Sequence, residues 1–70
     1  MKEDVPLRTI STVRHRDVWA VASDGRRLRH FDYRVDAEEA ALRLADKARN
    51  THTRVEVLAQ DQWGEVTTIA

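Results

Sequence analysis

Hydrophobic residues recur at helical spacing in one segment of the chain, between residues 35 and 50. At about 100° per residue, one stripe of this segment is formed by small and branched apolar residues: Ala37, Ala41, Leu44 and Ala48, with Ala40 and Ala45 beside it. Asp36 is the expected N-cap, because Glu39 follows at the spacing of a capping box. Asn50 suits the end of the helix. We therefore expect an amphipathic helix whose alanine-rich stripe lies close against a sheet.

Five other segments have the composition or the alternation of β-strands. They cover residues 7–14, 18–23, 27–33, 53–59 and 65–70. An Asp24-Gly25 pair separates the second from the third, and a turn closed by Gly64 separates the last two. The resulting order is β-β-β-α-β-β. It predicts an α+β fold in which one antiparallel sheet carries a single helix on one face.

The loop at Asp24-Gly25 decides which side chains of the first hairpin face the helix, because opposite residues share a face. A two-residue loop pairs Val21 with Leu28 and leaves a second face that is rich in arginine: Ala20, Ala22, Arg27, Arg29 and Phe31. A three-residue loop instead collects the aromatic side chains on the helix side with Val21: Trp19, Phe31 and Tyr33. It leaves four residues outside: Val18, Ala20, Leu28 and His30. Asp-Gly is typical of a two-residue loop, but a small core needs its aromatic residues, which favours the three-residue loop.

This register predicts the hydrophobic core. Its expected members come from all the elements: Val13, Trp19, Val21, Phe31, Ala41, Leu44, Ala48, Val55, Val57 and Ile69. For Trp63, in the last turn, we expect a place in the core, and the alternative is an exposed anchor for a partner.

The length of 70 residues indicates a single domain over residues 1–70, with residues 1–6 as a flexible N-terminus. A core this small favours self-association. The chain has no cysteine, so neither a disulfide nor a thiolate metal site is expected. The charged start, MKEDVPL, and the lack of a long apolar run predict a cytoplasmic protein without signal peptide or membrane span.

No motif indicates catalysis. His15, His30 and His52 are scattered without metal-ligand spacing, and no glycine-rich loop or nucleophile elbow occurs. We therefore expect no enzyme activity, no cofactor and no metal.

Charge is uneven along the chain although the net charge is zero. Residues 8–34 carry seven arginines against three aspartates, or +4, and residues 35–70 carry four bases against seven acids, or −3. Arginine bridges phosphates and tryptophan stacks on bases. The candidate binding residues for a partner or for nucleic acid are therefore Arg14, Arg16, Arg27, Arg29, Arg34, Trp19 and Trp63. The structural alternative is that these arginines cover strand edges and prevent aggregation.

Several short motifs resemble those of a family of small bacterial proteins catalogued as a domain of unknown function. Its members read W-A-V, T-x-x-E-A and then a V-x-V hairpin. The matching residues here are Trp19-Ala20-Val21, the aromatic Tyr33, Asp36-Ala-Glu-Glu39-Ala40, Ala45, Ala48 and Val55-Glu-Val57. This resemblance covers roughly residues 10–69 and implies a compact sheet-plus-helix fold with no assigned activity. Asp36 stands where members often carry threonine, and DQWGE where they often carry Asp-Gly.

A weaker similarity, over residues 19–48, is to AP2-type and integrase arm-binding domains. In these domains an arginine- and tryptophan-rich sheet binds DNA. The hairpin over residues 53–70 has no counterpart in them. Our leading prediction is a non-enzymatic protein-interaction module that binds a protein partner or a second copy of itself through a sheet face or strand edge. The alternative is a nucleic-acid-binding module that uses an arginine-rich sheet face.

Overall fold

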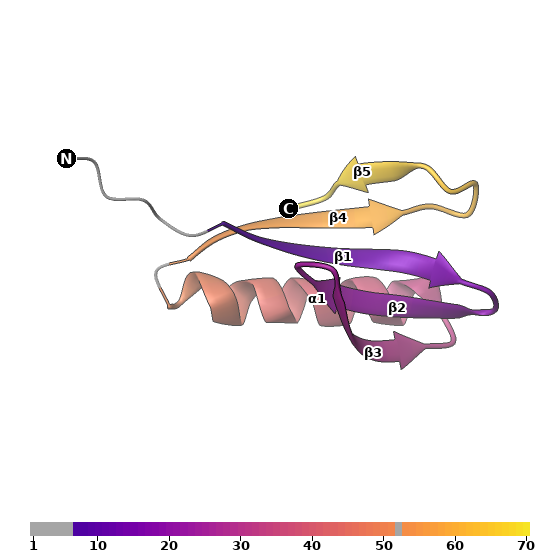
Figure 1. The fold of residues 1–70 in the computed structure, drawn as a ribbon, viewed down its shortest axis with the longest axis horizontal. Coiled ribbons are helices and arrows are strands. Elements are labelled where there is room, and N and C mark those ends of the chain that lie inside the picture. The colour runs from indigo at the N-terminus through magenta and orange to yellow at the C-terminus, as the bar shows by residue number, and fades with distance from the viewer. Residues whose placement is uncertain (1–6, 52) are drawn as a thin grey trace.

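Five strands and one helix make up residues 7–51 and 53–70, the part of the chain that the computed structural model describes. The elements are β1 (Leu7–His15), β2 (Val18–Ser23), β3 (Arg26–Phe31), α1 (Arg34–Arg49), β4 (Arg54–Gln60) and β5 (Val66–Thr68). One helix on a five-stranded sheet is the expected α+β fold (Figure 1). The predicted flexible segment 1–6 lies outside the described residues. In the described ranges, no helix combines the length and the apolar character needed to cross a membrane.

The sheet is mixed, with strand order β3-β2-β1-β4-β5. Three neighbouring pairs are antiparallel, but β1 and β4 run parallel. The prediction of a wholly antiparallel sheet is therefore wrong for the central pair of strands, β1 and β4. The reason is that α1 carries the chain back along the sheet, so β4 starts at the same end as β3 and β1 (Figure 1).

Helix α1 begins earlier than its capping signal predicts. Tyr33 is the N-cap, without a side-chain cap, and its carbonyl accepts a hydrogen bond from the Ala37 amide at 3.2 Å. The prediction of Asp36 as N-cap is wrong, since Asp36 lies within the first turn, where its charge favours the helix dipole. Asn50 is the C-cap as expected. The buried stripe consists only of alanines: Ala37, Ala41, Ala45 and Ala48.

The β2–β3 hairpin has the two-residue loop, so the favoured three-residue loop is wrong. Asp24 and Gly25 have φ of 51° and 84°, and Ser23 lies opposite Arg26. Two positive φ values are those of a type I′ turn, which Asp-Gly favours. Asp24 also caps the start of β1, because its Oδ1 accepts from the Thr9 amide at 2.9 Å.

A β-bulge then changes the register within the same hairpin. Ala22 lies opposite Arg27, but Val21 lies opposite Arg29, so the bulge leaves Leu28 as the extra residue of β3. Because of this shift, Trp19 lies opposite Phe31, and the two side chains share the helix side of the sheet as predicted. The bulge also turns Leu28 towards the helix instead of the outer face.

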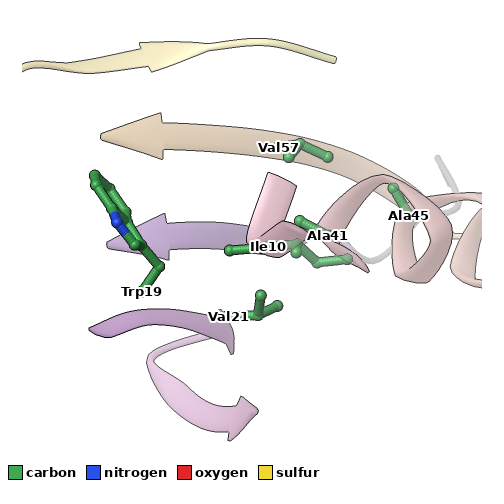
Figure 2. Close-up of a cluster of buried hydrophobic side chains, with 7 residues drawn as sticks. Ile10, Trp19, Val21, Ala41, Ala45 and Val57 are labelled. Atoms are coloured by element: carbon green, nitrogen blue, oxygen red, sulfur yellow. The ribbon is translucent and has the colours of Figure 1, made fainter. Parts of the chain in front are cut away.

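The core lies between the helix and one face of the sheet (Figure 2). Its buried members are Ile10, Trp19, Val21, Ala37, Ala41, Ala45 and Val57, with Phe31, Ala40, Leu44 and Val55 partly buried against them. Trp19, Val21, Ala41 and Val57 were predicted core residues, and Ala48 is buried as predicted too. Ile10 was not predicted.

Four expected core positions are wrong. Val13 lies opposite Ala20 on the outer face, because Ile10 and Thr12 take the inner positions of β1. Ile69 is exposed, since α1 packs across β1–β4 and does not reach β5. Trp63 and Tyr33, at 81% and 68% exposure, lie in a turn and at the helix start.

Thr12 is a buried polar residue whose replacement is expected to stabilise the fold. Its side chain is fully buried, and its Oγ1 has no hydrogen-bond partner in the part of the chain that the structure describes. Burying a hydroxyl without a partner costs about 1–3 kcal/mol. We expect Thr12→Val, which keeps the shape and removes the hydroxyl, to raise the free energy of unfolding by about 1 kcal/mol in urea titrations. Thr12→Ser, which keeps the hydroxyl and removes a methyl group, should lower it. A loss of stability in Thr12→Val would show that the hydroxyl has a partner in solution.

Candidate interaction surface

The two central candidate arginines lie on opposite faces of β3. Arg27 is opposite Ala22, which puts it on the outer face of the sheet. Arg29 is opposite Val21, on the side that carries α1. The β-bulge at Leu28 separates them, because it inserts one residue between two positions that would otherwise share a face. A single flat partner therefore cannot contact both side chains.

The other candidate arginines gather at one end of the molecule. Arg14 is the last residue but one of β1, Arg16 follows in the β1–β2 turn with φ of 59°, and Arg34 opens α1. Figure 1 shows this turn, the β4–β5 turn and the start of α1 at the same end. Local contacts occupy two of these side chains: Arg14 Nε donates to the Arg16 carbonyl at 3.2 Å, and Arg34 Nε lies 3.7 Å from Glu38 Oε2.

Trp63 lies at this same end, on a turn whose backbone is fixed by hydrogen bonds from side chains. The Oδ1 atom of Asp61 accepts from the amides of Trp63 and Glu65, at 2.8 and 2.9 Å. The Gln60 side chain links the turn to β1, because its Oε1 accepts from the Arg14 amide at 2.8 Å and its Nε2 donates to the Gly64 carbonyl at 3.2 Å. The ring of Trp63 is thus presented to solvent from a fixed backbone. The exposure of Trp63 agrees with the alternative prediction that this side chain lies outside the core.

Trp19 takes no part in this surface. Its side chain is 9% exposed and packs in the core beside α1. A ring in that position has no face to offer to a base or a partner.

The outer face of the sheet has no layer over it in residues 7–51 and 53–70, because α1 lies on the opposite side. Six apolar side chains lie on this face: Val13, Val18, Ala20, Ala22, Leu58 and Val66. Polar side chains interrupt them, since Ser11 lies between Ala22 and Leu58. Thr9 and Glu56 lie on the same face, and their Oγ1 and Oε1 atoms are 3.1 Å apart in a hydrogen bond. The prediction that the outer face is apolar around Val18 and Ala20 agrees with this arrangement.

The two edges of the sheet differ in chemistry. Edge strand β3 carries Arg26, Arg27 and Arg29 and is bent by the bulge, both of which oppose edge-to-edge pairing. Edge strand β5 and the residues after it, 66–70, are VTTIA, exposed and without charge. The sequence analysis predicts that a sheet face or a strand edge binds a partner, but it does not single out the edge of β5. The sequence feature that could have indicated this edge is the lack of charged side chains over residues 66–70.

Hydrogen bonding shows which groups of β5 remain free. The Ile69 amide donates to the Val57 carbonyl at 2.8 Å, and the Asp61 amide donates to the Glu65 carbonyl at 2.8 Å. Residues 65 and 69 therefore bond inwards to β4, and since bonding alternates along an antiparallel pair, Val66 and Thr68 direct their N–H and C=O groups outwards. Among residues 7–51 and 53–70, these outward groups have no hydrogen-bond partner, so they form an open edge.

Comparisons of this chain with protein-family models, with curated proteins and with solved structures find no match. Within the described ranges, no three His, Asp or Glu side chains gather closely enough to hold a metal ion.

Proposed function

We propose that this chain is a non-enzymatic protein-interaction module that pairs with a second copy of itself through the free edge of β5. The observation that carries the proposal is the contrast between the two sheet edges. Arginines and a bulge protect β3, whereas segment 66–70 has no charged side chain, and the outward groups of Val66 and Thr68 have no partner among the residues that the structure describes. Such an edge is a ready template for another strand.

An antiparallel pairing centred on Thr67 makes this edge self-complementary. Val66 of one copy then lies opposite Thr68 of the other, and by two-fold symmetry the reverse pair forms as well. Each such pair exchanges two backbone hydrogen bonds, about four in all. The sheet becomes continuous across the two copies, and on its outer face Val66 of each copy lies beside Thr68 of the other. Burial of the Val66 side chain against Thr68 supports the short strand pairing.

The nucleic-acid alternative receives less support from the positions of the arginines. A basic sheet face requires Arg27 and Arg29 on one surface, but they lie on opposite faces. Arg34 is also within ion-pair distance of Glu38.

Sedimentation velocity tests the pairing, and Thr68→Pro is the decisive variant. Proline removes one outward N–H without removing any bond to β4, because Thr68 bonds outwards. The interface is small, so we expect wild type to contain dimers at about 0.5 mM and monomers when diluted about a hundredfold. Thr68→Pro should stay monomeric at both concentrations with an unchanged circular dichroism spectrum.

Thr68→Val is the matched control, since it changes the side chain and keeps the N–H group. It should dimerise at least as well as wild type. A monomeric wild type at the higher concentration contradicts the proposal, and so does a Thr68→Pro variant that dimerises equally.

A further inference from the structure

A small half-open cavity lies between β3 and α1, on the helix side of the sheet. Its volume is about 210 Å³. Six residues line it: Val21, Leu28, Arg29, Ala40, Arg43 and Leu44. Four of these are apolar and two are arginines, and no carboxylate is among them. The cavity therefore combines an apolar floor with positive charge.

The β-bulge builds this combination. It puts both Leu28 and Arg29 opposite Val21. The apolar side chain of Leu28 and the cationic side chain of Arg29 therefore both line the cavity on the helix side of the sheet. Across from them, the small side chain of Ala40 leaves room beside α1. Leu28 remains 45% exposed, and covering it with an apolar group would release water from its surface.

The two arginines differ in what already holds them. The Arg29 guanidinium carbon lies 5.0 Å from the centroid of the Phe31 ring, a cation–π contact that orients it. No ion pair to Arg29 is present among residues 7–51 and 53–70. Arg43 Nη2 lies 3.1 Å from Glu39 Oε1, but both side chains are largely exposed, so this pair is weak. Positive charge thus remains for an anion at the cavity.

We propose that this cavity binds a short aliphatic carboxylic acid as its anion. The hydrocarbon tail contacts Val21, Leu28 and Leu44. The carboxylate accepts hydrogen bonds from Arg29 and Arg43, whose planar guanidinium groups suit a carboxylate. The cavity volume is below the usual range for pockets that bind drug-sized ligands. This small volume favours a ligand whose hydrocarbon tail has about five carbons. This site is independent of the β5 edge and of the proposed pairing.

Hexanoate and 1-hexanol form a matched pair of probes, because they share the alkyl chain and differ in charge. In titrations of ¹⁵N-labelled protein at pH 7, we expect hexanoate to give saturable shifts of backbone amides confined to the residues around the cavity. Hexanol should bind about tenfold more weakly. Equal binding of the two probes would overturn recognition of the anion, and shifts that do not saturate would overturn the site.

Three variants locate the contacts. Arg29→Gln should raise the dissociation constant of hexanoate about tenfold and leave that of hexanol unchanged. Glu39→Gln should lower the dissociation constant of hexanoate several-fold, because Arg43 loses its competing carboxylate partner. Ala40→Leu, at a half-buried position, should fill the cavity and abolish binding of both probes. If Ala40→Leu binds hexanoate like wild type, or if the same amides shift with protein concentration alone, the cavity is not a carboxylate site.

Discussion

Replacement of Ala41 by aspartate is expected to unfold the protein. Ala41 is fully buried on the face of α1 that packs against the sheet, among the side chains of the core (Figure 2). A carboxylate there would lie among the apolar side chains of the core, and burying it without a partner costs several kcal/mol. A single small core rarely supplies more than about 3–5 kcal/mol. Far-UV circular dichroism during heating should show no cooperative transition.

Leu42→Asp is the control for this change. It adds the same charge at the next residue of the same helix, where the side chain is exposed. Its free energy of unfolding should stay within about 0.5–1 kcal/mol of wild type. If Ala41→Asp melts cooperatively near the wild-type temperature, the alanine stripe does not face the sheet.

Truncation of the two tryptophans is expected to have very different effects on stability. Trp19→Ala removes the largest side chain of the core, at 9% exposure, and leaves a cavity between the sheet and α1. Such truncations cost about 3–5 kcal/mol, which is comparable to the whole stability of a domain of this size. Chemical denaturation of Trp19→Ala should therefore show a protein that is largely unfolded in water.

Trp63→Ala should leave the unfolding midpoint unchanged, because its ring is 81% exposed and packs in no core. Tryptophan fluorescence also distinguishes the buried Trp19 from the exposed Trp63. In Trp63→Phe only Trp19 emits, so the folded protein should emit at shorter wavelength than wild type and shift on unfolding. Equal losses of stability in the two alanine variants would contradict the assigned positions.

The helix and three alanines of its buried face were predicted correctly because helical periodicity is a local property, whereas Ala45 takes the place on the buried stripe that was predicted for Leu44. Ala37, Ala41 and Ala48 recur at spacings that only one regular element brings onto one side. The start of the helix was missed for a tertiary reason. The Asp36–Glu39 spacing predicts a cap, but the short connection from Phe31 brings Tyr33 to the end of the sheet and begins the helix there.

In the β2–β3 hairpin, too, one feature follows from local sequence and another from tertiary packing. Asp24-Gly25 predicts a two-residue turn through the positive φ values that it accommodates. The burial of aromatic side chains predicts that Trp19 and Phe31 share the helix side. Both are true, because the bulge at Leu28 reconciles a local turn preference with a tertiary demand. Neither pattern predicts a bulge, since its energy depends on the packing of Val21, Leu28 and α1.

By itself the sequence determined the number and kind of elements, the small-residue face of α1 and the uncharged run at residues 66–70. These follow from propensity, periodicity and charge, which act over a few residues. Only the tertiary structure decided that β4 lies beside β1, that Trp63 stays in solvent, and that Arg27 and Arg29 separate. Those outcomes depend on contacts between residues far apart along the chain, such as the pairing of β1 with β4 and the packing of α1 on β1, β2, β3 and β4, which local sequence patterns do not encode.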